Sequence, residues 1–343
     1  MTAGPRRDLA AVADALVAPR KGVLAADEST ATMSARLREA GVAATRDNRR
    51  AYREMLVTTP GLGDGISGII LSAETFGQRL ADGTPFPAAI SQRGMLTGIK
   101  VDAGTQPLPG SAAETITEGL DGLPPRLADY AARGAAFAKW RAVLRIGDGT
   151  PSMAAIRANA DALARYAAAC QHAGLVPIVE PEVLMSGSHS LGQCELATSA
   201  VLLQVAAALQ DYGVALDAVV LKPSMALPGS GCGQPASPAQ VAQATLATLA
   251  SIPVTLAGVA FLSGGQPPAR ATANLAALQL LPHIWPLTFS FGRALVAPAL
   301  TAWRTAGPAA GQQALARRVA MNVAALAGLY RPEHERLPAP EPS

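Results

Sequence analysis

Short runs of apolar residues recur along the chain at intervals of roughly 35–40 residues, and the stretches between them have helical spacing. Most runs are nearly continuous and do not alternate with polar residues, which is typical of strands covered on both faces, as in parallel sheets. The pattern predicts eight strands: GVLAAD (22–27), GISGIILS (65–72), MLTGIKVD (95–102), FAKWRAVLRI (137–146), LVPIVEPEV (175–183), AVVLKPSM (218–225), GVAFLSGG (258–265) and PLTFSFG (286–292).

Helices are expected between these runs. Residues 46–58 open on a polar turn, and residues 151–174 place Pro151 in their first turn and Gly174 at the C-cap position. A doubly wound sheet also alternates strands and helices, but it does not require eight repeats. Strand–helix alternation repeated eight times is the sequence form of a (β/α)8 barrel, so we predict an α/β fold of the TIM-barrel type.

The domain organisation follows from length and composition. The chain has 343 residues, 50% of them hydrophobic, and no long linker divides it. We therefore expect a single barrel domain over residues 1–330. Residues 331–343 are rich in proline and charge, which favours a flexible tail.

Composition also excludes several classes of partner. The formal charge of +3 comes from scattered Lys and Arg residues, and only 4% of residues are aromatic, so we expect no nucleic-acid partner. The N-terminus lacks the apolar core of a signal peptide, and prolines interrupt the charge-free stretch 223–269, so we expect no membrane association. Three widely spaced cysteines (Cys170, Cys194 and Cys232) favour a reducing cytoplasm over a disulfide or zinc framework.

Charged and polar residues cluster where the predicted strands end. In a parallel barrel these carboxyl ends meet at one mouth, which is where catalytic residues lie. Lys139 with Arg141, and Glu180 with Glu182, are two residues apart, so each pair faces the same side of its strand. The residues expected at the mouth are Asp27, Lys100, Lys139, Arg141, Glu180, Glu182, Lys222, Ser263 and Arg293.

Lys222 stands out because it follows the apolar run Val219–Leu221. A buried lysine among other cations and apolar walls has its ammonium form disfavoured, so its amine is able to form a Schiff base with a carbonyl substrate. A nearby carboxylate must then move protons. Surplus Lys and Arg, with the backbone amides of residues 263–265, suit phosphate groups. The four histidines show no metal-ligand spacing, so we expect no metal.

Eight collinear motifs resemble those of the class I, Schiff-base fructose-1,6-bisphosphate aldolases. They span roughly residues 8–330, and their order across the chain makes the resemblance specific although each is weak alone. The motifs are KGVLAADEST (21–30), GIKVDAG (98–104), EGLDGL (118–123), FAKWR (137–141), VPIVEPE (176–182), LKPSM (221–225), FLSGGQ (261–266) and TFSFGRAL (288–295).

The resemblance implies an aldol-cleaving lyase and a role for each site residue. Lys222 forms the imine, Glu180 is the acid/base, supported by Glu182, Asp27 accepts the C4 hydroxyl proton, and Lys139 stabilises the carbinolamine. The implied substrate-binding residues are Arg141 beside Lys139, Ser263, Gly264 and Arg293 at one phosphate, and Ser29, Thr32 and Lys100 at the other. The resemblance also implies phosphorylated sugars as partners, no organic cofactor, and a homo-oligomer, either a tetramer or a dimer.

Two departures from the family pattern are of interest. Ser224 stands where many relatives carry Asn, and the chain ends PAPEPS where animal relatives have a tyrosine that assists proton exchange at the enamine. The last tyrosine here is Tyr330, so we expect slower enamine protonation or another donor.

Other interpretations remain open. Glu180 and Glu182 could form ordinary salt bridges with Lys139 and Arg141, and Asp27 could be a helix N-cap. Trp140 is expected on the outer strand face as a packing residue. At the level of function, the alternatives are a Schiff-base aldolase for another phosphorylated ketose and a non-catalytic scaffold on the aldolase fold.

Overall fold

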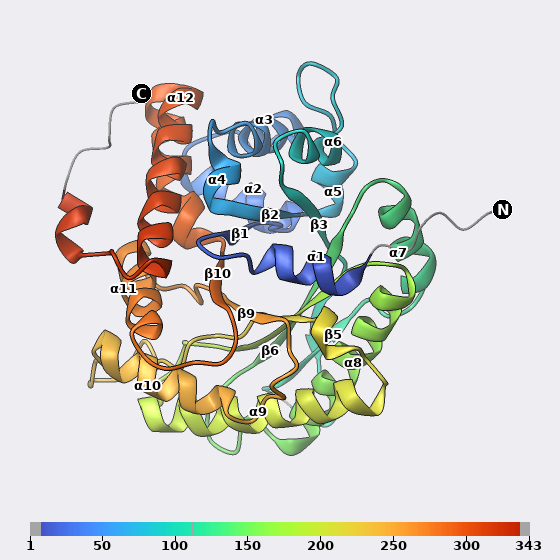
Figure 1. Ribbon diagram of the computed structural model, residues 1–343, viewed down its shortest axis with the longest axis vertical. Coiled ribbons are helices and arrows are strands. Elements are labelled where there is room, and N and C mark those ends of the chain that lie inside the picture. Colours follow the sequence, from blue (N-terminus) through green and yellow to red (C-terminus); the bar gives the residue numbers. More distant parts are fainter. Residues whose placement is uncertain (1–7, 112, 337–343) are drawn as a thin grey trace.

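The computed structural model of the protein describes residues 8–111 and 113–336. In this part of the chain, eight parallel strands close into a barrel in the order β1-β2-β3-β6-β7-β8-β9-β10 (Figure 1). The strands are β1 (Gly22–Ala26), β2 (Ile66–Leu71), β3 (Leu96–Lys100), β6 (Phe137–Leu144), β7 (Val176–Val183), β8 (Val220–Leu221), β9 (Gly258–Phe261) and β10 (Leu287–Phe291). Each lies within one of the eight predicted runs, so the TIM-barrel prediction is confirmed.

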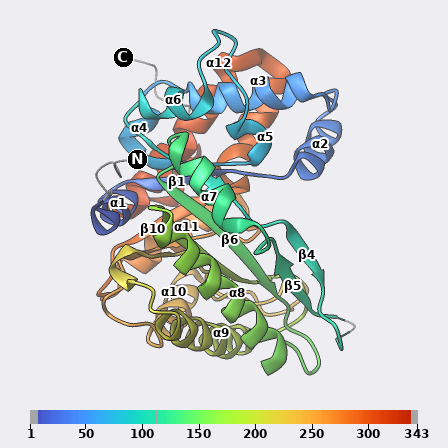
Figure 2. The same ribbon diagram turned by 90° about the vertical axis from the view of Figure 1, so that its right-hand side faces the viewer.

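Helices surround the barrel, as Figures 1 and 2 show. They are α1 (Leu9–Leu16), α2 (Thr30–Glu39), α3 (Arg46–Val57), α4 (Leu62–Gly65), α5 (Ala73–Phe76), α6 (Phe86–Ser91), α7 (Leu123–Ala132), α8 (Met153–His172), α9 (Leu191–Asp211), α10 (Pro238–Leu249), α11 (Pro268–Gln279) and α12 (Arg293–Leu326), with 3₁₀ turns η1 (Leu216–Ala218) and η2 (Pro332–Arg336). Several begin at a Ser or Thr whose side chain accepts a main-chain N–H of the first turn, as N-caps do: Ser29, Thr45, Ser72, Ser152, Ser190 and Ser237.

The barrel interior changes from apolar to charged along its axis. Val23, Phe137, Val176 and Val220 form a buried cluster with Leu16, which brings α1 against the end where the strands begin. Two or four residues further along the same strands, the inward positions carry Lys139, Glu180 and Lys222. Because side chains alternate along a strand, this alignment follows from the period of two in the sequence.

The outer layer is a second apolar core between the strands and the helices. Trp140 is fully buried, and its ring lies 5.5 Å from that of Tyr166 on α8, so its expected packing role on the outer strand face is confirmed. Helix α9 is long and apolar enough to cross a membrane by length and composition alone. It packs against α8, α10 and β7 as one helix of the ring.

Two local predictions need correction. β8 has only two ladder residues, because Pro223 follows Lys222 and has no N–H to donate. Helix α8 starts at Met153 behind the N-cap Ser152, so Pro151 precedes its first turn.

An additional antiparallel hairpin, β4 (Gly104–Pro107) with β5 (Thr115–Glu118), lies beside β6 (Figure 2). It was not predicted, since its residues are mostly polar and at least partly exposed.

The end of the chain is ordered further than the predicted tail implies. In the turn η2, the Glu335 carboxylate is paired with Arg318 of α12 at 2.5 Å and accepts a hydrogen bond from the Tyr330 hydroxyl at 3.1 Å. The rest of the predicted tail, residues 337–343, lies outside the described residues. The flexibility of this segment therefore stays a prediction, as does the division into one domain and a tail.

Candidate active site

One cavity of about 520 Å³ opens at the carboxyl ends of the barrel strands. It gathers side chains from both halves of the chain, as expected for a barrel mouth. All twelve predicted site residues line it: Asp27, Ser29, Thr32, Lys100, Lys139, Arg141, Glu180, Glu182, Lys222, Ser263, Gly264 and Arg293. The structure therefore brings these residues together, while their assignment to a catalytic or binding site stays a prediction.

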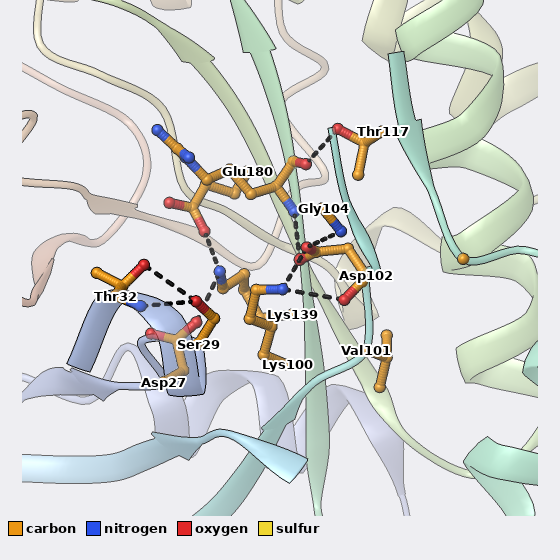
Figure 3. Close-up of polar contacts among 12 residues, drawn as sticks. Asp27, Ser29, Thr32, Lys100, Val101, Asp102, Gly104, Thr117, Lys139 and Glu180 are labelled. Atoms are coloured by element: carbon orange, nitrogen blue, oxygen red, sulfur yellow. Dashed lines mark hydrogen bonds and ion pairs between the residues drawn. The ribbon is translucent and has the colours of Figure 1, made fainter. Parts of the chain in front are cut away.

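The centre of the cavity is a buried cluster of two ammonium groups and two carboxylates. Lys139 Nζ lies 2.7 Å from Asp27 Oδ2 and 3.1 Å from Glu180 Oε2 (Figure 3). Lys222 Nζ lies 3.4 Å from the same Glu180 oxygen. Glu180 Oε2 is within ion-pair distance of both lysines but accepts no hydrogen bond of good geometry from a described residue. It is therefore free to exchange a proton with an incoming group.

The charges in this cluster hold one another in the ionised form. Burial alone would raise the pKa of Asp27, but the ammonium groups of Lys139 and Lys222 lower it well below the ordinary value of 3.8. Burial alone would lower the pKa of Lys139, but Asp27, Glu180 and Asp102 raise it above the ordinary 10.5. Lys139 and Asp27 are thus a charged pair at neutral pH.

Asp27 follows β1 and faces Lys139, so it does not cap the next helix. Ser29 is the N-cap of α2 instead, because its hydroxyl accepts the Thr32 main-chain N–H at 3.2 Å. The alternative interpretation of Asp27 as an N-cap is therefore wrong. The carboxylate is left available to the cavity.

Arg141 and Glu182 form a second ion pair nearer the solvent. Arg141 Nε lies 2.5 Å from Glu182 Oε2. Burial alone would lower the pKa of Arg141, but Glu182 and the other nearby carboxylates raise it above its ordinary value. The open interpretation that the two glutamates pair with Lys139 and Arg141 thus describes real contacts. These contacts do not exclude catalysis, since all four residues line the cavity.

A phosphate site needs free donors, and one end of the cavity offers them. After β9 the chain passes through Ser263, Gly264 (φ 56°) and Gly265 (φ 87°), a left-handed turn that only glycine adopts readily. A Cβ on Gly265 would lie 3.0 Å from Arg293 Nη2, so the guanidinium rests against this glycine. Arg293 is the first residue of α12, whose N-terminus favours anions.

The other end of the cavity carries donors that already have partners. Ser29 Oγ and Thr32 Oγ1 are 3.0 Å apart at the start of α2. Lys100 Nζ donates to a carboxylate oxygen and to the main-chain oxygen of Asp102. Figure 3 shows both pairs beside the central Lys139–Asp27 contact.

Asp102 was missed as a site residue, although it lies inside the GIKVDAG motif. Its buried carboxylate is paired with Lys100 and accepts main-chain N–H groups of Gly104 and Arg141, both at 3.3 Å (Figure 3). It therefore ties β3 to β6. Glu28, Arg36 and Ser290 also line the cavity without having been predicted. Two of them could have been found in the sequence. Glu28 directly follows Asp27, and Ser290 occupies an inward-facing position in the alternation of β10.

Some residues singled out by the sequence lie elsewhere. Tyr330 does not line the cavity, and its hydroxyl is bonded to Glu335. Among residues 8–111 and 113–336, no three His, Cys, Asp or Glu side chains form a group with metal-ligand geometry.

Comparison with known proteins agrees with this geometry. The family model described as fructose-bisphosphate aldolase class-I matches residues 8–341. A probable fructose-bisphosphate aldolase class 1 from Xanthomonas campestris pv. campestris is 48% identical over 94% of this chain and 98% of that protein. Fructose-bisphosphate aldolase B of Gallus gallus is 47% identical over 95% of this chain and 91% of its own.

A solved structure gives the same answer for the fold. Fructose-bisphosphate aldolase from Plasmodium falciparum, crystallised with TRAP and a small-molecule inhibitor, superposes with a TM-score of 0.92 at 42% identity. The match covers 94% of this chain and 95% of that one. Since the family model spans nearly the whole sequence and full-length relatives share almost half of their residues with it, the chain belongs to the class I fructose-bisphosphate aldolase family.

Proposed function

We propose that the protein reversibly cleaves fructose 1,6-bisphosphate to dihydroxyacetone phosphate and glyceraldehyde 3-phosphate, with Lys222 as the Schiff-base nucleophile. The observation that carries the proposal is the position of Lys222, whose Nζ lies buried at the cavity 3.4 Å from Glu180. A buried amine beside a carboxylate that moves protons suits attack on a ketone. The reaction is that of a lyase in glycolysis and gluconeogenesis and uses neither a metal nor an organic cofactor.

The proposed steps follow from the residues around the amine. Lys222 first passes a proton from its ammonium group to Glu180, 3.4 Å away, and the neutral amine adds to C2. Glu180, supported by Glu182, then returns this proton to the departing hydroxyl, so the carbinolamine loses water and leaves the protonated imine. The protonated imine takes up the electron pair of the C3–C4 bond, while Asp27 accepts the C4 hydroxyl proton and glyceraldehyde 3-phosphate leaves. The enamine then takes a proton at C3, and water hydrolyses the imine, which restores Lys222 and releases dihydroxyacetone phosphate.

The lowered pKa of Asp27 sets a condition on this mechanism. A carboxylate held strongly ionised by Lys139 is a weak base. We therefore infer that Lys139 shifts from Asp27 toward the substrate oxygen when substrate enters, which also stabilises the carbinolamine. Releasing this contact raises the basicity of Asp27 at the moment it accepts the proton.

The two phosphates of the substrate fit the two ends of the cavity. Ser263, Gly264 and Arg293 bind one phosphate through main-chain N–H groups and the guanidinium. Ser29, Thr32 and Lys100 bind the other, and Arg141 contacts the substrate beside Lys139. Both groups of residues line the same cavity, which supports a substrate with two anionic termini.

Assembly and location are further parts of the proposal. A cytoplasmic homo-oligomer, either a tetramer or a dimer, is what the family resemblance implies. Leu196 and Leu203 on α9 are 75% and 54% exposed and lie on one face of that helix, which supports burial against a second subunit.

The proposal is tested by trapping the imine. Incubation with dihydroxyacetone phosphate and borohydride should add the mass of the reduced adduct at Lys222, and Lys222→Ala should lose both the adduct and turnover. Lys222→Arg is the matched control, because it keeps the positive charge but forms no imine and should also be inactive. An adduct on another lysine, or cleavage retained in either variant, would reassign the nucleophile.

The alternatives give different results in the same assays. An aldolase for another phosphorylated ketose would form the adduct but show a higher kcat/KM for, for example, sedoheptulose 1,7-bisphosphate. A non-catalytic scaffold on the aldolase fold would form no adduct and cleave none of these sugars.

A further inference from the structure

Ser224 lies where the hydrogen-bond ladder of the barrel is shortest. β8 contributes only Val220 and Leu221, and the next residue is Lys222. The Lys222 N–H donates to Val179 O at 2.8 Å and so makes one more contact to β7. Pro223 has no N–H, although its carbonyl oxygen accepts the Leu262 N–H at 3.0 Å. The main chain therefore loses its attachment to β7 immediately after Lys222.

The Ser224 side chain restores that attachment. Its Oγ accepts the main-chain N–H of Val183 at 2.9 Å and donates to the carbonyl oxygen of Val183 at 3.0 Å. Ser224 is buried, with 4% of its surface exposed, so neither bond competes with solvent. Val183 is the last residue of β7 and directly follows Glu182.

We propose that Ser224 is a positioning residue that fixes Lys222 relative to the two glutamates of β7. The three-residue segment 222–224 is held at both ends, at Val179 through the Lys222 N–H and at Val183 through the Ser224 hydroxyl. The stretch of β7 between these two anchors carries Glu180 and Glu182. The Lys222–Glu180 contact therefore lies between two hydrogen-bonded anchors that join the same two segments. This inference rests on the proposed role of Lys222 as the nucleophile.

The loop beyond Ser224 has anchors of its own. Ala226 N donates to Thr245 Oγ1 at 2.9 Å, Leu227 N to Cys194 Sγ at 3.4 Å, and Gly229 N to His189 O at 2.8 Å. Because these contacts do not involve Ser224, its removal should loosen the segment that carries Lys222 without detaching the whole loop.

The effect of each Ser224 substitution should depend on how well the new side chain hydrogen-bonds to Val183. Asn carries both an acceptor and donors on its side chain, so it is able to bond both main-chain groups of Val183. Cys has nearly the volume of Ser but bonds weakly, and Ala bonds neither group. We therefore expect imine formation to slow in the order Ser, Asn, Cys, Ala.

The test is the single-turnover rate of imine formation with dihydroxyacetone phosphate, measured by borohydride quench and mass spectrometry and expressed per folded protein. We expect Ser224→Ala to slow this step at least about 10-fold, because misplacing a reacting group by less than an ångström costs this much. The half-saturating concentration of dihydroxyacetone phosphate should change less than about threefold, since the phosphate contacts remain. If Ser224→Ala does not fold, Ser224→Cys gives the same reading with a smaller loss.

Ser67 provides a matched control. It is also a buried serine, with its hydroxyl 2.7 Å from Leu16 O and 3.1 Å from Gly22 O, but it lies at the opposite end of the barrel. Ser67→Ala should lower the Tm and leave the imine rate unchanged. A wild-type imine rate in folded Ser224→Ala and Ser224→Cys, or an equal slowing in Ser67→Ala, would overturn the inference. Labelling of the wild type at a residue other than Lys222 would instead overturn the proposed function.

Discussion

The two ends of the cavity differ in whether their donors are already occupied. At the Arg293 end, the guanidinium makes no hydrogen bond or ion pair with any described residue, and it rests on the glycine turn at Gly265. At the Lys100 end, the ammonium group is paired with Asp102, and Ser29 is paired with Thr32. A phosphate at the first end gains new bonds, whereas at the second end it must compete with partners inside the protein, so its net gain is smaller.

The ends also differ in their connection to the central ion pairs. Asp102, the partner of Lys100, helps to raise the pKa of Lys139, and Lys100 helps to lower the pKa of Asp27. Arg293 is not among the charges that shift either group. Changes in the central cluster should therefore alter phosphate binding at the Lys100 end and leave it unchanged at the Arg293 end.

The largest expected effect is that of Asp27→Asn on stability. The substitution removes the nearer of the two carboxylates paired with Lys139 and leaves Glu180 shared between two lysines. The free energy of unfolding should therefore fall by about 3 kcal/mol at pH 7. The folded pKa of Asp27 is lowered from 3.8, so its contribution is present above pH 3.8 and is lost as the pH falls below that value. The folded pKa of Lys139 is raised from 10.5, so its contribution is full below pH 10.5 and is lost only at higher pH.

Urea unfolding of wild type and Asp27→Asn at several pH values checks this prediction. The difference between them should be constant from about pH 5 to pH 9 and should narrow at pH 3. Asp129→Asn is a control, since its pair with Arg133 is exposed on both sides and should contribute less than about 1 kcal/mol. Inhibition by inorganic phosphate should persist in Asp27→Asn if the Arg293 end is independent of the centre, and its loss would break the comparison.

Arg293→Ala should have the next largest effect, on binding. Hydrogen bonds to charged groups contribute about 1.5–3 kcal/mol, so the KM for fructose 1,6-bisphosphate should rise by up to about 100-fold. The Tm should not change, because the guanidinium makes no bond within the described protein. Arg293→Lys should recover only part of the affinity, since it loses the planar fork. Arg304→Ala, an exposed arginine on the same helix, controls for net charge and should behave as wild type.

The sequence predicted the barrel strands well because these strands are buried on both faces. Their apolar runs are therefore nearly continuous and differ clearly from the helical spacing between them. It failed at β8, where Pro223 removes the ladder and the Ser224 side chain takes its place. It also missed the hairpin β4–β5, whose residues carry no clear apolar period. At β8 the deciding contact is made with Val183, which lies 41 positions earlier in the chain.

The sequence indicated which charged residues share a face of the barrel strands, but not which of them form ion pairs with one another. Alternation along β6 and β7 indicated that Lys139, Arg141, Glu180 and Glu182 face one side. Which carboxylate each cation contacts depends on the shear of the barrel, which the sequence does not specify. Asp102 was missed for the same reason, because its partner on β6, Arg141, lies 39 positions further along the chain.

A smaller effect is expected for Lys100→Met. The substitution removes a phosphate donor but also removes a competing contact with Asp102, so the KM should rise by about 10-fold or less. Lys100→Arg, which keeps the charge near Asp102, should lie between this variant and wild type. Steady-state kinetics beside Arg293→Ala makes the comparison direct. A larger KM increase for Lys100→Met than for Arg293→Ala would show that the Asp102 pair opens at no cost, and the proposed difference between the ends would be wrong.

The smallest effect on binding is expected for Ser29→Ala. Ser29 is the N-cap of α2, so the free energy of unfolding should fall by about 1 kcal/mol, as it should in Ser237→Ala at the N-cap of α10. Because the Ser29 hydroxyl is already engaged with Thr32, the KM should change less than about threefold in both variants. Thermal unfolding and steady-state kinetics on this pair separate capping from binding. A tenfold rise in KM for Ser29→Ala alone would mean that the hydroxyl leaves the cap and donates to phosphate. The two ends of the cavity would then bind phosphate by the same means.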